Sequence, residues 1–463
     1  MAEPKFRIES DLLGELKVPI DAYYGVQTQR ALNNYRISNT RMCDYPEYVI
    51  AIAYVKMAAA EANAELGVLD RKIADAIIAA CKEIVDGKFH DQFPVDMMQG
   101  GAGTSVNMNA NEVIANRALE LMGHKKGEYQ FCSPNDHVNC AQSTNDAYPT
   151  AFRYTFVRMN KHLVKSLEEL IAAFRAKGEE FKHILKMGRT QLQDAVPMTS
   201  GQEFNAFANN LQEEIANLER NAVLLREINM GGTAIGTGLN AVPGFADLCT
   251  IRMSEFCGDE LVKAADLVEA TPDTGAYVSY SAALKRLAIK LSKICNDLRL
   301  MASGPRCGLH EINLPPMAPG SSIMPGKVNP VIPEVTNQVC FKVIGNDTTV
   351  AFAAEAGQLQ LNVMEPVIAE SILESVTWLR NAIDTLRTKC IEGITVNADH
   401  CYKMVKNSIG IVTALNPYIG YKGSTKVAKK ALETGRSVYD IVLEEGLMTK
   451  EKLDEALDPE AML

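Results

Sequence analysis

Paired histidines and paired cysteines are absent from this sequence. Its 7 histidines form no H-x-x-x-H or H-E-x-x-H motif, which argues against a structural or catalytic zinc site. Its 11 cysteines include no C-x-x-C pair, and their odd number and irregular spacing fit free thiols better than a disulfide framework. No run approaches the ~18 apolar residues of a membrane span, and the charged N-terminal stretch lacks the apolar core of a signal peptide. We therefore expect a cytoplasmic protein with reduced cysteines.

Basic residues are fewer than acidic ones, with 47 Lys and Arg against 57 Asp and Glu. The formal net charge is −10 and the pI is about 5.4, which disfavours nucleic acid as a partner because such binding depends on neutralising phosphates. A local pocket of positive charge could still bind a small anion. With 463 residues, of which 47% are hydrophobic, the chain can bury a large core, and its length favours about three domains.

Strand patterns and internal repeats are sparse, whereas helical periodicity is strong. Apolar residues from Leu284 to Met301 recur at spacings of 3 and 4, and a second run extends from Phe204 to Leu225. Further helices are expected after Asn145 and Pro330, and from Pro366 to about Cys390. These stripes indicate core packing rather than a cofactor site. We expect a mainly α fold with an N-terminal mixed helical domain, a central helical-bundle domain and a small C-terminal helical domain, at residues 1–142, 143–396 and 397–463.

One glycine motif imitates a nucleotide site. Residues 236–241 match G-x-G-x-x-A, but they follow a helical stretch, Gly201 to Ile228, rather than a strand. Without a surrounding βαβ unit we expect no dinucleotide site there.

Four segments interrupt the helices with small residues and hydroxyls. They are residues 99–109, 142–146, 188–195 and 320–330. Each precedes a plausible helix, where backbone N–H groups and Ser or Thr side chains can bind an anion. The alternative for each alone is an ordinary N-cap with a glycine turn, and Ser143 to Asp146 in particular fits capping chemistry.

The most informative of these segments is Gly320-Ser-Ser-Ile-Met-Pro-Gly-Lys-Val-Asn-Pro330. Glycine permits close backbone approach, so a mobile loop is expected, with Asn329 as the N-cap and Pro330 as the first residue of a helix. Two hydroxyls and a cation in such a loop suit a small carboxylate or phosphate.

Together these segments resemble the aspartase/fumarase superfamily over essentially the whole chain. The 320–330 loop is similar to the superfamily's signature. Thr104-Ser105, Thr144 and Gln191 favour its ammonia-lyase branch over the fumarases, which usually carry histidine at the position of Gln191. Some aspartases have histidine there as well, so the role of Gln191 stays open.

The resemblance implies a three-domain fold with a central five-helix bundle. It also implies a homotetramer in which each active site draws segments from three subunits. The implied reaction is the reversible deamination of L-aspartate to fumarate and ammonia through an aci-carboxylate intermediate. No organic cofactor or resident metal is implied, and a divalent cation such as Mg²⁺ is left open as an activator.

The same resemblance assigns roles to individual residues. Ser321 matches the base that removes the Cβ proton. The resemblance also implies substrate-binding residues. Their roles are to donate to the developing carboxylate, to bind the α-carboxylate or to lie near the amino group. These residues are Thr104, Ser143, Thr144, Asn145, Thr190, Gln191, Ser322, Lys327 and Asn329. Two alternatives remain at this stage: a fumarase of the same superfamily, and a non-catalytic helical structural protein.

Overall fold

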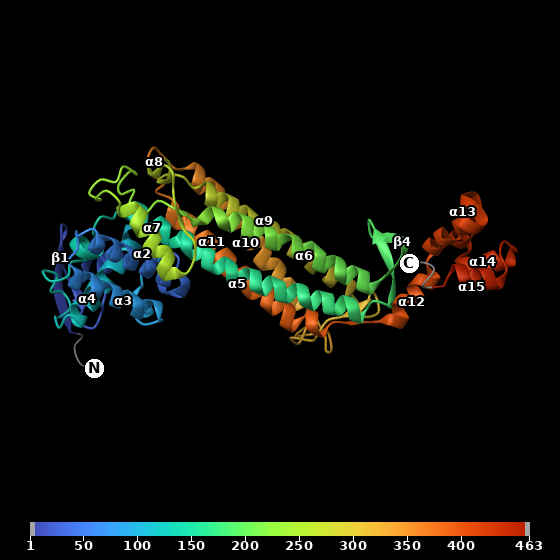
Figure 1. Cartoon of the computed structure of the whole chain (residues 1–463). Helices are drawn as coiled ribbons and strands as arrows, with labels where there is room; N and C mark the ends of the chain where they lie inside the picture. Colours follow the sequence, from blue (N-terminus) through green and yellow to red (C-terminus); the bar gives the residue numbers. More distant parts are fainter. Residues whose placement is uncertain (1–4, 459–463) are drawn as a thin grey trace. The chain divides into compact units, whose positions relative to one another are not determined.

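The structure, a computed structural model, describes residues 5–458 and is mainly α-helical (Figure 1). It divides into two compact units. The first comprises the residues up to Val164, Ala216–Arg286 and Lys342–Trp378, and the second comprises Lys165–Ile215, Leu287–Phe341 and the residues from Leu379 onward. The unit boundaries fall inside long helices, so neither unit is one continuous stretch of chain. The three domains expected from the sequence, and the two boundaries between them, stay a prediction.

Five long helices dominate the fold. They are α5 (Thr144–Glu180), α6 (Ser200–Val223), α9 (Gly275–Met301), α10 (Val331–Glu355) and α11 (Glu365–Lys389). The predicted seam from Leu284 to Met301 lies on α9, and all six of its apolar side chains are at most 5% exposed. The run from Phe204 to Leu225 is likewise buried apart from Ile215, which is half-buried. The 3.6-residue periodicity therefore predicted both the helices and the faces that pack.

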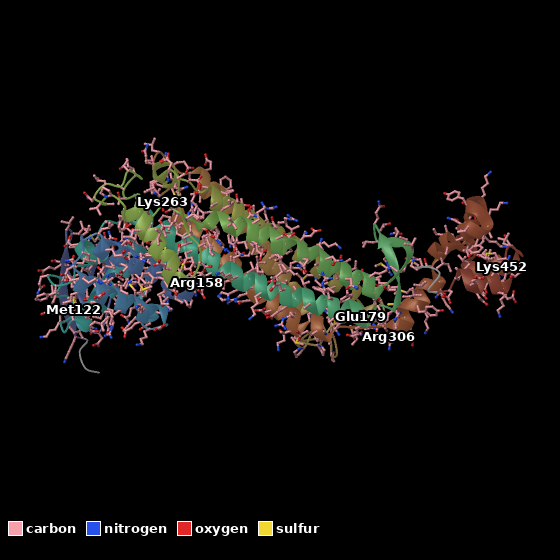
Figure 2. All side chains as sticks on the ribbon, viewed as in Figure 1. Met122, Arg158, Glu179, Lys263, Arg306 and Lys452 are labelled. Atoms are coloured by element: carbon pink, nitrogen blue, oxygen red, sulfur yellow. The ribbon has the colours of Figure 1, made fainter. Side chains whose placement is uncertain are left out.

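Shorter α-helices precede, separate and follow the long helices along the chain. The N-terminal helices are α1 (Val26–Asn34), α2 (Pro46–Glu65), α3 (Arg71–Val85) and α4 (Thr104–Leu121), followed later by α7 (Phe245–Cys257) and α8 (Leu267–Ala270). The C-terminal helices are α12 (Ala398–Asn407), α13 (Asn416–Thr434), α14 (Val438–Glu444) and α15 (Lys450–Ala456). Charged side chains such as Glu179 on α5 and Lys452 on α15 are exposed (Figure 2). No helix within residues 5–458 combines the length and apolar character needed to cross a membrane.

Within residues 5–458 the strands form four separate two-stranded ladders. Three are antiparallel: β1 (Phe6–Asp11) with β2 (Gly14–Pro19), β3 (Leu185–Thr190) with β4 (Gln193–Thr199), and β7 (Ile312–Asn313) with β8 (Thr395–Val396). The fourth, β5 (Glu227–Ile228) with β6 (Val262–Lys263), is parallel, and α7 lies between its strands in the chain.

This parallel pair corrects the expectation that no strand precedes the glycine motif at residues 236–241. The ladder is only two residues long on each side, and Gly236 allows close backbone packing. Its φ is +93°, and a Cβ there would lie 2.2 Å from the Leu267 carbonyl oxygen. Glycine is therefore required for close backbone contact with the residues that begin α8.

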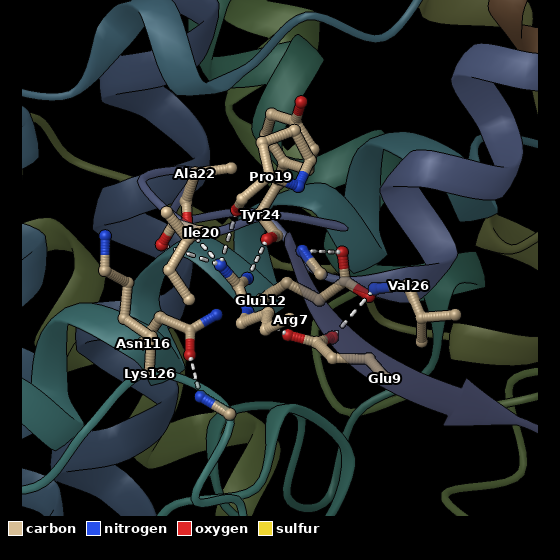
Figure 3. Close-up of polar contacts among 12 residues, drawn as sticks. Arg7, Glu9, Pro19, Ile20, Ala22, Tyr24, Val26, Glu112, Asn116 and Lys126 are labelled. Atoms are coloured by element: carbon tan, nitrogen blue, oxygen red, sulfur yellow. Dashed lines mark hydrogen bonds and ion pairs between the residues drawn. The ribbon is translucent and has the colours of Figure 1, made fainter. Parts of the chain in front are cut away.

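Helix α4 is anchored to the N-terminal segment by buried carboxylates (Figure 3). Glu112 accepts hydrogen bonds from the backbone N–H groups of Gly25, Gln27 and Thr28 at the start of α1, at 2.8–3.1 Å. Burial raises the pKa of Glu112 to about 7, although these donors oppose the rise. Glu9 of β1 accepts from the N–H of Val26, the first residue of α1, at 2.9 Å. The carboxylates thus satisfy donors that the start of a helix leaves unpaired, and they fix α1 against α4.

Candidate active site

Thr104 begins α4 directly after an unusual backbone turn. Gly101, Ala102 and Gly103 all have positive φ, at 87°, 53° and 91°. Gly103 is required there because a Cβ would lie 2.4 Å from the ring of buried Tyr148. Thr104 is exposed, and its hydroxyl donates to the Gly101 carbonyl oxygen at 2.8 Å. The turn therefore presents a hydroxyl at a helix N-terminus, where negative charge is favoured.

Ser143 to Asp146 form a capping box at the start of α5, as the sequence predicted. Ser143 Oγ accepts from the Asn145 N–H at 3.2 Å, and Asp146 Oδ1 accepts from the Ser143 N–H at 2.9 Å. Asp146 is fully buried, and its second oxygen accepts from the Thr233 N–H at 3.0 Å. Burial raises the pKa of Asp146 to about 6. Asp146 thus caps α5 and also holds the loop that follows β5.

Asn145 is held in one orientation by that same loop. Its Nδ2 donates to the Ala234 carbonyl oxygen at 2.6 Å, so its Oδ1 points away as an acceptor. A pocket of about 390 Å³ lies here, lined by Ser143 and Ala234 together with residues of the 135–142 and 239–240 segments. A hydroxyl and helix N-terminal donors beside such a pocket can bind a small carboxylate.

Thr144 is linked to a buried polar group that the sequence analysis missed. Its Oγ1 accepts from Asn107 Nδ2 at 3.1 Å, and Asn107 Oδ1 in turn accepts from the Lys56 ammonium at 2.7 Å. Both Lys56 and Asn107 are at most 1% exposed. A sequence signal was present, since Lys56 is the only charged residue in the apolar stretch of α2 between Glu47 and Glu61.

Thr190 and Gln191 lie at the tip of the β3–β4 hairpin. Thr190 pairs with Gln193, so Gln191 and Leu192 form a two-residue turn, with φ values of 54° and 62°. That geometry matches the turns that suit antiparallel strands, but neither residue is the Gly, Asn or Asp that such turns prefer. Both side chains are exposed. Within β3, Lys186 and Arg189 pair with buried Glu311 at 2.9 and 2.5 Å.

The 320–330 loop is closed by its own backbone. The Gly320 N–H donates to the Lys327 carbonyl oxygen at 2.8 Å, and a Cβ at residue 320 would lie 2.0 Å from that oxygen. Asn329 Nδ2 donates to the Gly320 carbonyl oxygen at 2.6 Å. A pocket of about 470 Å³ is lined by the loop, including Ser321 and Lys327. Ser322 and Lys327 are exposed.

Within this loop Ser321 occupies a distinctive position. Its Oγ accepts hydrogen bonds from the backbone N–H groups of Ile323 and Met324, at 3.1 and 2.9 Å. Donors of this kind stabilise negative charge on an oxygen and lower its pKa.

The prediction that Asn329 caps the next helix was wrong by one residue. Helix α10 begins at Val331, and its first helical bond runs from the Glu334 N–H to the Pro330 carbonyl oxygen.

The ten predicted site residues divide between the two units. Thr104, Ser143, Thr144 and Asn145 belong to the first, and the others, on the hairpin and the 320–330 loop, belong to the second. A hydrogen bond between Asn107 and Thr144 joins α4 to the start of α5. A second, from Asn329 to Gly320, joins the two ends of the 320–330 loop. Among residues 5–458, no group of three or more His, Cys, Asp or Glu side chains could hold a metal ion.

The chain is similar to known lyases over nearly its whole length. A family model described as "Lyase" matches residues 14–345, and another, "Fumarase C C-terminus", matches residues 411–463. Aspartate ammonia-lyase of Pseudomonas aeruginosa is 60% identical over 458 residues, with 99% of this chain and 97% of the relative covered. The enzyme of the same name from Escherichia coli K12 is 60% identical over 450 residues, covering 97% and 94%.

Solved structures agree. The fumarate lyase:delta crystallin of Brucella melitensis bound to cobalt superimposes with a TM-score of 0.96 at 52% identity, covering 99% of this chain and 100% of that one. A class II fumarase from Schistosoma mansoni gives a TM-score of 0.93 at 35% identity, covering 99% of both. The chain therefore belongs to the aspartase/fumarase superfamily of lyases. With relatives at 60% identity over almost full length, it is further identified as a carbon–nitrogen lyase of that superfamily.

Proposed function

We propose that this chain catalyses the reversible deamination of L-aspartate to fumarate and ammonia, without an organic cofactor. The observation that carries the proposal is Ser321, whose Oγ accepts two backbone N–H bonds inside a glycine-closed loop that also bears Lys327. The high identity to aspartate ammonia-lyases supports the choice of substrate.

The chemical difficulty is the removal of a Cβ proton beside a carboxylate that is already charged. A serine hydroxyl is a weak base unless its ionised form is stabilised. The N–H groups of Ile323 and Met324 provide such stabilisation, and the Lys327 ammonium in the same loop adds positive charge. Ser321 then takes the proton from Cβ, and the electron pair moves into the β-carboxylate to give the aci-carboxylate.

Stabilising that doubly negative intermediate is the largest task of the site. The proposed donors are the hydroxyls of Thr104, Ser143, Thr144 and Ser322, of which Thr104 would exchange its bond to the Gly101 carbonyl oxygen for one to the substrate. In the structure Thr104 and Thr144 begin α4 and α5, where the helix dipole also favours negative charge.

The remaining residues recognise the rest of the substrate. Lys327 and Asn329 are proposed to grip the α-carboxylate, with Thr190 and Gln191 beside them. Asn145 suits the amino group, because its Nδ2 is engaged by Ala234 and its Oδ1 is left to accept from an ammonium. Collapse of the intermediate expels the amine as ammonia and leaves fumarate.

We further propose a homotetramer whose active sites each combine segments of three subunits. Support comes from large apolar side chains that a single chain leaves exposed on its long helices: Ile289 (50%), Val335 (42%), Phe341 (60%), Phe352 (72%) and Trp378 (41%). Exposed apolar surface of this kind is typical of subunit interfaces. The separation of the ten site residues into two units also suits composite sites.

One assay distinguishes the proposed ammonia-lyase from a fumarase and from a non-catalytic protein. Purified protein is incubated with L-aspartate or with L-malate, and fumarate is followed by its ultraviolet absorbance. Release of fumarate and ammonia from L-aspartate alone is the expected result. Turnover of L-malate alone would establish a fumarase, and turnover of neither would indicate a non-catalytic scaffold. Repeating the assay with EDTA and with added Mg²⁺ measures the contribution of a divalent cation.

A further inference from the structure

A buried ammonium lies behind the start of α5. Lys56 of α2 is 0% exposed, and its Nζ donates to three side-chain carbonyl oxygens: Asn107 Oδ1 at 2.7 Å, Asn139 Oδ1 at 3.0 Å and Gln142 Oε1 at 2.8 Å. Three acceptors match the three protons of an ammonium. All of these partners are neutral amides, so no hydrogen-bonded carboxylate cancels the charge.

This ammonium determines which way the Asn107 amide faces. A protonated lysine can only donate, so Asn107 Oδ1 points towards the Lys56 ammonium. Its Nδ2 is consequently directed to the opposite side, where it donates to Thr144 Oγ1 and to Asn139 Oδ1, each at 3.1 Å. Turning the amide over would place two donors against each other in the buried interior, which is costly.

The direction of the Asn107 bond then determines the direction of the Thr144 hydroxyl. A hydroxyl has one proton and two lone pairs. Because Thr144 Oγ1 uses a lone pair to accept from Asn107, its proton is available to a group outside the protein interior. Thr144 is half-buried at the first position of α5.

We propose that Asn107, held by Lys56, is a positioning residue that keeps the Thr144 hydroxyl a donor to the substrate's β-carboxylate. This inference rests on the proposed deamination, in which that carboxylate gains charge as the aci-carboxylate forms. A donor held in place before the reaction stabilises that charge without reorganising.

Electrostatics sets the pH range of this role. Burial lowers the pKa of Lys56 to about 7, and the negative charge of Asp146 opposes the fall. Lys56 is therefore mainly an ammonium below about pH 7. The positive charge lies one side chain away from Thr144, on the side from which Asn107 donates.

The test replaces Asn107 by aspartate. Asn107→Asp keeps the size of the side chain and the acceptor facing Lys56, which gains a charged partner, but it removes the Nδ2 donor. We expect kcat for L-aspartate to fall at least about tenfold, roughly the effect of losing one hydrogen bond to the transition state. The unfolding temperature measures the balance between the new buried ion pair with Lys56 and the contact of the second carboxylate oxygen with Asn139 Oδ1, which is also an acceptor.

Asn109→Asp is the matched control. Asn109 lies on the same helix and is also 0% exposed, but its Nδ2 donates to the Gln92 carbonyl oxygen at 2.9 Å, away from Thr144. We expect this variant to lose stability and to keep its kcat. Equal losses of kcat in both variants would reveal a general effect of a buried carboxylate on α4 and would overturn the inference.

A mutant cycle with Thr144→Val tests the route. If Asn107 acts through Thr144, Asn107→Asp should lower kcat by less than about twofold in the Thr144→Val background. A full additional loss there would contradict the inference, as would a wild-type kcat in the single variant. Should Asn107→Asp fail to fold, Asn107→Ala carries the same expectation for kcat. Lack of turnover by the unmutated protein would instead refute the proposed function itself.

Discussion

Ser321 is the residue on which the proposed chemistry depends most. Ser321→Ala should lower kcat by about 10²–10⁴-fold, the usual effect of losing a general base. Its side chain bonds only within the loop, to the N–H groups of Ile323 and Met324, so the fold should persist. Steady-state kinetics together with circular dichroism and size-exclusion chromatography check both expectations. Retention of more than about a tenth of wild-type kcat would show that another group is the base.

Glu365, which is not one of the proposed site residues, gives the stability of the fold a pH dependence. It is fully buried at the start of α11 with one carboxylate oxygen unpaired, and burial raises its pKa to about 8 against the attraction of Arg153. A carboxyl group with a raised pKa holds its proton in the folded state, so its favourable contribution to stability is complete below pH ~4.5 and is lost as pH rises to about 8.

Glu365→Gln removes this titration while keeping the shape of the side chain. The variant should therefore become progressively more stable than wild type from pH 5 to pH 9, by on the order of a few kcal/mol at the alkaline end. Unfolding temperatures of both proteins at pH 5, 7 and 9 measure the difference. A difference that does not vary with pH would mean that Glu365 keeps an ordinary pKa.

The sequence predicts the proximity of residues only where they belong to one short motif. Ser321 and Lys327 belong to one short loop, and the structure places them on one pocket. Lys56 and Asn107 could not be paired from sequence, because they lie 51 residues apart and meet only when α2 packs beside α4. A buried lysine can be recognised from its apolar surroundings, but its acceptors cannot.

At the scale of elements, the long helices were predictable because their apolar period is regular, whereas the β3–β4 hairpin was not. The hairpin turns at Gln191 and Leu192, which carry positive φ without the usual turn residues. Backbone strain of this kind is common where a site must present a particular side chain. The exposed Thr190 and Gln191 at this turn fit that pattern.

The buried seam of α9 makes a quantitative prediction. Leu291 is 0% exposed, so Leu291→Ala should destabilise the protein by about 2–5 kcal/mol through lost burial and a residual cavity. Lys293→Ala, two residues further along the same helix, is the control, because that side chain is 68% exposed and its pairing with Asp297 contributes little. Chemical denaturation of both variants provides the comparison. Similar, small effects would mean that the seam tolerates the cavity or that α9 is not part of the cooperative core.

At the scale of the whole molecule, apolar residues on the long helices raise the question of what covers them. Phe341 and Phe352 are 60% and 72% exposed in the single chain, although they lie on the same helix as fully buried Cys340. A helix that is apolar on more than one side is expected to be buried on more than one side. Packing of these helices against those of other subunits would bury Phe341 and Phe352 and would assemble the composite sites.

Composite sites can be tested by hybrid tetramers. Thr104→Ala and Ser321→Ala are each expected to be nearly inactive, and they damage segments that the structure assigns to different units of the chain. If Thr104 and Ser321 of one site come from different subunits, random reassociation of equal amounts of the two variants leaves about one site in four with both segments intact. Activity should then return to about a quarter of wild type per site.

If both segments of a site instead belonged to one chain, every site in the mixture would still carry one of the two substitutions, and activity would stay at the level of the parents. Native mass spectrometry of differently tagged variants establishes whether hybrids have formed, so a lack of activity cannot be mistaken for a lack of exchange. Hybrids without activity would contradict shared sites. A monomeric protein would contradict the tetramer directly, since Phe352 and Trp378 would then remain exposed to water.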